Sequence, residues 1–140
     1  MIDGIIISEQ NIIPTDGGPI YHGVKNSDIG FNTFGEVYFS FIDKNALKGW
    51  KLHTKMTMNI IVPVGEVRLN FIDDREHSKT LGNEFIINLS EKKNTRLTIP
   101  PNLWFAFKGL CEKNMLVNIA DIKHDSKEVV TKDINSMVFK

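Results

Sequence analysis

Cysteine is nearly absent from this chain of 140 residues, which contains only Cys111. A single cysteine excludes an internal disulfide framework and is typical of a protein in a reducing compartment. An excess of charge is absent as well, because 17 Lys and Arg side chains balance 17 Asp and Glu side chains. Without a net field of one sign, the composition indicates neither a nucleic-acid partner nor an anionic membrane surface.

Long apolar runs are also missing. No stretch approaches the roughly 20 residues that a membrane-spanning helix needs, and the first residues lack the basic-then-apolar order of a secretory signal. The length is about that of one domain with a real hydrophobic core. We therefore expect a soluble, cytoplasmic protein in which residues 1–140 form a single domain, with no membrane and no nucleic acid as partners.

Short stretches of β-strand character make up most of the chain. In residues 34–42 the polar and apolar side chains alternate, so that Tyr38 and Phe39 project from opposite faces. Turn signals recur about every 8 to 12 residues, which favours an all-β sandwich or barrel. The core is expected at about 34–125, with an N-terminal strand and loop at 1–33 and a C-terminal tail at 126–140 that is polar until residues 137–139 and can pack as a last turn or helix. The expected strands are residues 5–7, 34–42, 47–53, 56–62, 67–72, 84–89, 94–99, 104–107 and 115–122.

The stretch from Gly49 to Gly65, GWKLHTKMTMNIIVPVG, is the most informative part of the sequence. Lys51 and His53 are two residues apart, so on a strand they project from the same face. In a small β-barrel one face of each strand points into the lumen, which is where a ligand binds.

The spacing in this stretch resembles the first motif of the cupin barrels. His53 falls at the second histidine of that motif, Met58 at its glutamate and Gly65 at its closing glycine, whereas Lys51 takes the place of the first histidine. A second motif resembles residues 100–105, where Phe105 replaces the last metal-binding histidine. Ammonium, thioether and phenyl groups are poor ligands for the metals that imidazole and carboxylate bind. The resemblance therefore implies an all-β cupin jelly roll without a metal and without another cofactor.

Within the cupins, the chain resembles the dTDP-4-dehydrorhamnose 3,5-epimerases and the related isomerases of 4-keto nucleotide sugars. This resemblance implies a homodimeric, metal-independent isomerase or epimerase that binds a thymidine-diphosphate sugar and removes a proton next to the C4 ketone. It also implies a place in carbohydrate biosynthesis, such as that of lipopolysaccharide O-antigen. The segments that carry it are KGWKLH at 48–53, PVGEVRLNFIDDR at 63–75, LTIPPNLWFAFKGL at 97–110 and NMLVNIADIKHD at 114–125.

The family's functional residues match this sequence at some positions and differ at others. The general-base histidine of the epimerase segment RGLH falls at Lys51, while the second histidine of the ketoisomerase segment HAH falls at His53. The epimerase tyrosine follows an aspartate in the last core strand. Here Asp121 is present, but Ile122 and Lys123 follow it.

The residue chemistry gives a mechanism for these positions. Removing a proton next to a ketone needs a base that works near neutral pH, and imidazole is suited to that task. We expect His53 to be the base, Lys51 to polarise the keto oxygen or bind phosphate, and Tyr38 to be a proton donor if its face turns inward.

The remaining expected contacts concern substrate binding. Aromatic side chains can form a stacking wall for a base or a sugar, and arginine matches phosphate with two parallel hydrogen bonds. His124, near two aspartates, is expected on the charged surface. The expected substrate-binding residues are Arg68, Arg75, Trp104, Phe105, Phe107, Asn118 and Asp121.

Three functions are compatible with the sequence. The first is the isomerase or epimerase that the resemblance implies. The second is a cupin that binds a sugar or nucleotide sugar without catalysis, which the replaced histidine and the missing tyrosine favour. The third is a metal-dependent cupin enzyme, which the loss of three ligand positions opposes.

Overall fold

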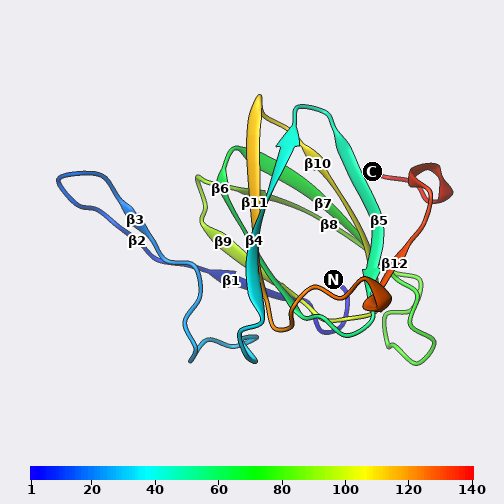
Figure 1. Cartoon of the computed structure of the whole chain (residues 1–140). Helices are drawn as coiled ribbons and strands as arrows, with labels where there is room; N and C mark the ends of the chain where they lie inside the picture. Colours follow the sequence, from blue (N-terminus) through cyan, green and yellow to red (C-terminus); the bar gives the residue numbers. More distant parts are fainter.

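The computed structural model describes residues 1–140, and its regular secondary structure consists almost entirely of short strands (Figure 1). Eight of them correspond to strands expected in the core from the sequence, because each has the alternating or fully apolar pattern that a buried sheet face requires. The elements are β1 (Ile6–Glu9), β2 (Ile12–Ile13), β3 (Ile20–Tyr21), β4 (Glu36–Asp43), β5 (Leu47–His53), β6 (Met58–Val64), β7 (Glu66–Asp73), β8 (Glu84–Ser90), β9 (Thr95–Ile99), β10 (Leu103–Gly109), β11 (Lys113–Ala120), η1 (Ser126–Glu128), β12 (Val129–Thr131) and η2 (Ile134–Ser136).

Two five-stranded antiparallel sheets face each other and enclose the core. One sheet has the order β1-β9-β6-β11-β4 and the other has the order β12-β5-β10-β7-β8. The sheets close together at one end of the barrel and separate at the other, where β4 and β5 form the opposite walls of a hollow (Figure 1). This is the cupin jelly roll that the sequence indicated.

The closed end of the barrel is filled by alternate side chains of the two sheets. On β7, Val67, Leu69 and Phe71 are fully buried, and from the facing sheet Leu97 and Ile99 of β9 are fully buried as well. They belong to one cluster of 17 buried apolar residues. Each fully buried side chain of this size contributes roughly 1.5–3 kcal/mol to stability, so this end is a rigid support for the open end.

The N-terminal segment contains a feature that the sequence did not reveal. Residues 1–33 were expected to contain one strand and a loop, but the loop includes a two-stranded hairpin in which Ile12 pairs with Tyr21 and Ile13 with Ile20. This β2–β3 hairpin extends away from the barrel as an arm (Figure 1). All four of its strand side chains are exposed apolar groups.

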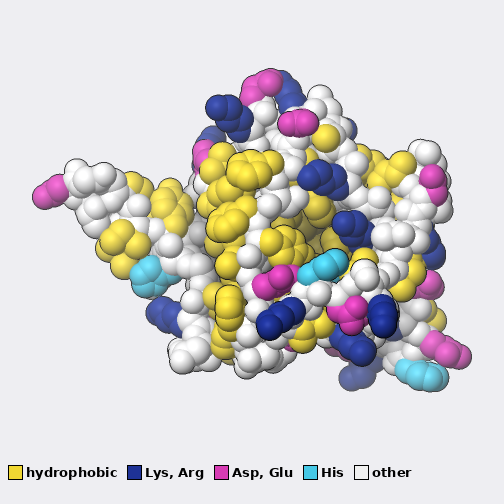
Figure 2. Space-filling view, in the orientation of Figure 1, with side chains coloured by type: hydrophobic (Ala, Val, Ile, Leu, Met, Phe, Trp, Pro, Cys, Tyr) yellow, Lys and Arg dark blue, Asp and Glu magenta, His cyan; other side chains and the backbone are white.

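The outer face of the β4–β11 sheet is also apolar and open. Val37, Phe39 and Phe41 of β4 are 43%, 58% and 71% exposed, and Val64 at the end of β6 is 39% exposed. Figure 2 shows the apolar side chains gathered in a band over this part of the barrel. We refer to Val37, Phe39, Phe41 and Val64 as the outer apolar face.

The C-terminal segment is more ordered than a polar tail. After η1, strand β12 pairs with β5, so that Val129 lies opposite His53 and Thr131 opposite Lys51. The last residues cross the outer side of β5, where the indole of Trp50 donates a hydrogen bond to the carbonyl of Met137. The tail therefore supports the strand that carries the two residues singled out in the sequence.

The structure has no helix that is long and apolar enough to cross a membrane.

Candidate active site

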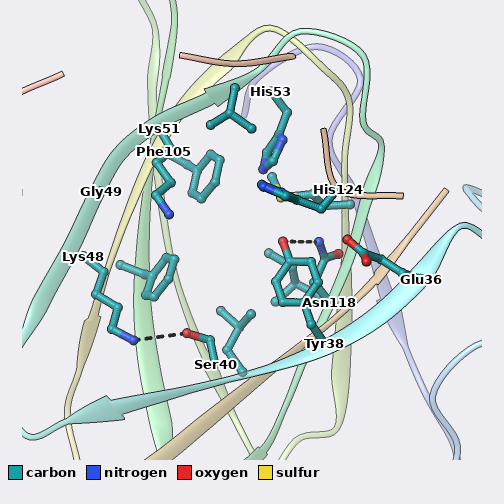
Figure 3. Close-up of a pocket in the computed structure, with 15 residues that line it drawn as sticks. Glu36, Tyr38, Ser40, Lys48, Gly49, Lys51, His53, Phe105, Asn118 and His124 are labelled. Carbon is teal, nitrogen blue, oxygen red and sulfur yellow. Dashed lines mark hydrogen bonds between the residues drawn. The ribbon is translucent and has the colours of Figure 1, made fainter. Parts of the chain in front are cut away.

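The open end of the barrel holds a cavity of about 430 Å³ between the two sheets. Its walls come from β4, β5, β6, β10 and β11, and the segment after β11 lies at its mouth (Figure 3). Six of the residues expected at the site line it: Tyr38, Lys51, His53, Phe105, Phe107 and Asn118. The other lining residues are Glu36, Ser40, Lys48, Gly49, Met58, Ile60, Leu116, His124 and Val129.

Strand β5 forms the cationic wall of the cavity. Its pairing with β10 shifts by one residue, because Lys51 lies opposite Phe105 but Gly49 lies opposite Ala106. The extra residue in β5 brings Lys48 to the cavity side as well, although it is three positions from Lys51. Gly49 is required at this point, since its φ is +129° and an added Cβ would lie 2.7 Å from the Cα of Ala106.

The two lysines of this wall differ in the hydrogen bonds that their ammonium groups make. The Lys48 ammonium donates to the carbonyl of Phe41 at 2.6 Å and to the hydroxyl of Ser40 at 3.3 Å. Lys51 makes no ion pair and no side-chain hydrogen bond. In Figure 3 its ammonium points into the cavity, where it is free to meet an anion or a polarised oxygen.

His53 is held at the end of the cavity by a carboxylate from a distant part of the chain. Its Nδ1 is hydrogen-bonded to Oε1 of Glu128 in η1, and both side chains are nearly inaccessible to solvent. The imidazole also stacks on Phe105, with the ring centroids 5.8 Å apart and the planes 12° apart. Because Nδ1 is occupied, Nε2 is the nitrogen available to a bound molecule.

Glu128 itself is fixed by the backbone. Its second oxygen accepts hydrogen bonds from the amides of Lys55 at 3.1 Å and of Met56 at 3.4 Å. Burial raises the pKa of the Glu128 carboxyl, but the hydrogen bonds from His53 and from these amides outweigh it, and the net pKa lies below the usual range. Glu128 is therefore an anion that orients the His53 ring through Nδ1.

Tyr38 lies on the opposite wall, on the cavity face of β4 (Figure 3). Its hydroxyl oxygen accepts a hydrogen bond from the amide nitrogen of Asn118 at 2.8 Å, so the phenol proton is free to point into the cavity. Burial raises the pKa of Tyr38, and the nearby carboxylates of Glu36 and Glu128 act in the same direction. Tyr38 is therefore kept protonated and able to donate a hydrogen bond.

The floor of the cavity is apolar and aromatic. Phe105 and Phe107 alternate with Trp104 and Ala106 on β10, so both phenyl rings face the lumen. The rings are nearly parallel, with centroids 6.3 Å apart and planes 9° apart. Asn118 is buried on β11 opposite Tyr38, and its carbonyl oxygen has no hydrogen-bond partner.

Two residues expected to bind substrate lie on the wrong side of their sheet. Trp104 points away from the cavity and packs with Trp50 beneath the C-terminal segment, where the ammonium of Lys132 lies 4.2 Å from its ring centroid. Arg68 lies on the outer face of β7 and donates to Asn88 at 3.1 Å. The strand period of two explains both corrections, since their neighbours Phe105 and Leu69 face inward.

Two further residues expected to bind substrate, Arg75 and Asp121, lie in loops and hold those loops in place. Arg75 holds its own loop together, because its guanidinium binds the carboxylate of Asp73 through two hydrogen bonds of 2.8 Å. Asp121 accepts a hydrogen bond from the amide of Thr57 at 2.8 Å and so anchors the segment that follows β11. Neither side chain lines the cavity.

Several residues that line the cavity or support its walls were not identified from the sequence. Glu36 and Ser40 share the alternation of Tyr38, so that pattern was the signal for their position. Lys48 depends on the extra residue in β5, and Glu128 on the return of the C-terminal segment, which no local pattern reveals. His124 is exposed, as expected from the sequence, and it also lies at the mouth of the cavity, which the sequence did not indicate.

The donor set of the cavity does not suit a metal ion. At the four cupin ligand positions the chain has Lys51, His53, Met58 and Phe105, of which only the imidazole is a good ligand. No group of three or more His, Cys, Asp or Glu side chains is arranged to hold a metal ion. The fold and this cavity define a cupin barrel whose polar groups are suited to proton transfer.

Comparisons with known proteins give the family. No protein-family model matches the chain. The crystal structure of a dTDP sugar isomerase from Desulfovibrio desulfuricans G20 matches with a TM-score of 0.93 and 32% identity, over 96% of this chain and 87% of that one. A dTDP-4-dehydrorhamnose 3,5-epimerase from Sulfolobus tokodaii matches with a TM-score of 0.87 and 21% identity, over 98% of this chain and 81% of that one.

A curated relative agrees with these structures. It is the probable low-salt glycan biosynthesis epimerase Agl13 of Haloferax volcanii, which is 25% identical over 93 residues. The matched region is 65% of this chain and spans 60% of the length of that relative. The chain belongs to the family of dTDP-sugar isomerases and epimerases.

Proposed function

We propose that the protein isomerises or epimerises a nucleotide-linked 4-keto-6-deoxy sugar by removing a proton from the carbon next to the ketone. The observation that carries this proposal is the pair of His53 and Glu128 at the end of the cavity. A histidine held by a buried carboxylate through Nδ1 presents Nε2 as a general base, and its positive charge after proton transfer is stabilised in place.

The groups around His53 provide the rest of this chemistry. When the C–H bond breaks, its electron pair moves onto the keto oxygen and an enolate forms. Lys51 supplies an unpaired ammonium and Tyr38 a free phenol proton, so both can stabilise that oxygen. These donors lie on opposite walls of the cavity (Figure 3).

The cavity also suits a sugar joined to a diphosphate. A hexose presents apolar C–H faces, for which Phe105 and Phe107 form a flat surface, and hydroxyl groups, for which the hydroxyls of Tyr38 and Ser40 that line the cavity are partners. Lys48 and Lys51 line one wall and give it the positive charge that a diphosphate needs. The dTDP sugar isomerase similar to this chain supports thymidine as the nucleoside.

A second candidate is a barrel that binds a nucleotide sugar without turning it over. The observation in its favour is Lys51, which stands where related enzymes have a histidine, so that only one imidazole is fixed on β5.

Solvent deuterium distinguishes these two functions. We would incubate the protein with a dTDP-linked 4-keto-6-deoxyhexose in deuterated water and follow C3 and C5 by NMR. Deuterium at either carbon, lost in His53→Ala and retained in the surface control His77→Gln, is expected for the enzyme. A sugar that binds with no exchange at either carbon indicates the binding function, and full exchange by His53→Ala contradicts the assignment of the base.

We further propose that two copies of the chain associate through the outer apolar face. This face and the β2–β3 arm are both exposed apolar surfaces, and within one chain the arm extends away from the barrel (Figure 1). In a two-fold pair each arm can pack on the other copy, which covers both surfaces at once. Exposed phenylalanines in a band of this kind usually mark a protein interface.

A cytoplasmic location completes the proposal. It is supported by Cys111, the single cysteine, which is exposed and unpaired.

A further inference from the structure

His124 is a second imidazole in the cavity that the proposed function has not used. It comes from the segment between β11 and η1, and its ring points into the cavity on the same side as His53 (Figure 3). The side chain is also exposed to solvent. It therefore lies between the interior of the cavity and bulk water.

The segment that carries His124 is fixed on both sides. Before it, the Asp121 carboxylate accepts a hydrogen bond from the amide of Thr57 at 2.8 Å. After it, the Asp125 carboxylate accepts one from the amide of Lys127 at 2.9 Å and caps η1. Because η1 also contains Glu128, the two imidazoles of the cavity are positioned by one short stretch of chain.

The residues assigned so far do not account for one step of the proposed reaction, the protonation of carbon that forms the product. His53 removes the proton and is then paired with Glu128, while Lys51 and Tyr38 face the oxygen of the enolate. His53 can return a proton only where it removed one, which regenerates the substrate, so product formation needs a second group that protonates carbon at another face or position. Burial raises the pKa of Tyr38, so its phenol is a poorer donor to carbon than an imidazolium in contact with water.

We propose that His124 is the second proton-transfer group and returns the proton to the carbon skeleton of the sugar. This inference rests on the proposed function. His53 takes the proton from carbon, the electron pair of that C–H bond becomes the enolate, and protonated His124 gives its proton to carbon as the carbonyl re-forms. His53 then releases its proton to water, and His124 takes one from water, so that both groups return to their starting states.

If His124 has this role, the rate of deuterium exchange and the rate of product formation respond differently to its replacement. In His124→Gln, His53 still removes the proton and exchanges it with deuterated water, so deuterium still enters the sugar. Product formation is expected to fall by about 100-fold or more, since a positioned acid or base contributes roughly 10²–10⁴ to the rate. Added imidazole is expected to restore part of the product formation in His124→Ala, because it can occupy the space left by the side chain.

The experiment compares the wild type, His124→Gln, His124→Ala with and without imidazole, and the control His77→Gln, which changes a surface histidine. Deuterium exchange within about threefold of the wild type, together with lost product formation, supports the role. A His124→Gln variant that forms product normally overturns it, and so does one in which both rates fall equally or only KM rises. If the wild type itself catalyses no exchange, the proposed function fails, which is distinct from failure of the His124 assignment alone.

Discussion

The carboxylate of Glu128 and the imidazole of His53 are hydrogen-bonded in the interior of the barrel although 75 positions separate them in the sequence. Strand β12 makes this contact possible, because it pairs with β5 and places Val129 directly opposite His53. The orientation of the proposed base therefore depends on the C-terminal segment.

Replacing Glu128 by glutamine tests that dependence. Glu128→Gln keeps the shape of the side chain but removes its charge, so the protonated form of His53 loses its partner. We expect kcat to fall by at least about tenfold, with a smaller change in KM. Glu112→Gln, which changes an exposed carboxylate in the β10–β11 turn, is the matched control. Unchanged kcat in Glu128→Gln would mean that the pair is only structural.

The hydroxyl of Tyr38 is expected to matter for rate more than for stability. Tyr38→Phe removes the donor to the enolate oxygen and leaves the ring, so kcat should fall by roughly 10- to 100-fold. Because burial raises the pKa of Tyr38, loss of activity through ionisation of the phenol should begin only above the usual range of about 10. The measurement is the steady-state kinetics of the wild type and of Tyr38→Phe, taken at intervals of roughly one pH unit from about pH 6 to about pH 11.

The loop after β7 is predicted to give the protein a pH-dependent contribution to stability. The Asp73 carboxylate is inaccessible to solvent, and hydrogen bonds from Arg75, Ser78 and Thr80 hold its pKa well below the usual range, although burial opposes this shift. A carboxyl whose folded-state pKa is depressed stabilises the fold at pH values above its unfolded pKa of about 3.9. That contribution is lost as the pH falls toward the folded-state value.

Asp73→Asn should therefore lower the free energy of unfolding by about 3 kcal/mol at neutral pH, because it leaves the Arg75 guanidinium without its anionic partner. The difference from the wild type should become smaller as the pH falls below the unfolded pKa of about 3.9. Urea unfolding at neutral and acidic pH measures both effects. Asp74→Asn, at the adjacent exposed position, is the control, and an equal loss in both variants would contradict the explanation.

The proposed association of two copies predicts a change of mass in solution. Phe39→Glu combined with Phe41→Glu places two charges on the outer apolar face, and we expect this variant to sediment as a single copy while the wild type sediments as a pair. Leu81→Glu changes an exposed apolar residue of another loop and should leave the pair intact. A wild type that sediments as a single copy at micromolar concentration would contradict the proposal.

The sequence predicted those parts of the molecule that depend on local alternation. The strand period correctly indicated that Lys51 and His53 share a face, and it made Tyr38 a candidate for the cavity. Alternation also indicated strands such as residues 34–42 and 84–89, whereas residues 56–62 were expected as a strand from their apolar run. The cupin family was indicated by the resemblance of residues 49–65 and 100–105 to its two motifs.

Local alternation could not predict features that depend on a shift in strand pairing or on the return of a distant segment. Lys48 lines the cavity only because β5 has an extra residue relative to β10. Glu128 is surrounded by polar residues in the sequence, and its burial becomes evident only when β12 is paired with β5. Trp104 and Arg68 were assigned to the site by residue type, but their strand positions place them on outer faces.

Strand β4 has a consequence for how ligand and assembly influence each other. Its even-numbered residues, Tyr38 among them, face the cavity, its odd-numbered residues face outward, and only one of its edges is paired, with β11. If contact with a second copy restricts the motion of this strand, it also makes one wall of the cavity more rigid. By thermodynamic reciprocity, a bound sugar nucleotide would then lower the dissociation constant of the pair by the same factor as pairing lowers that of the ligand.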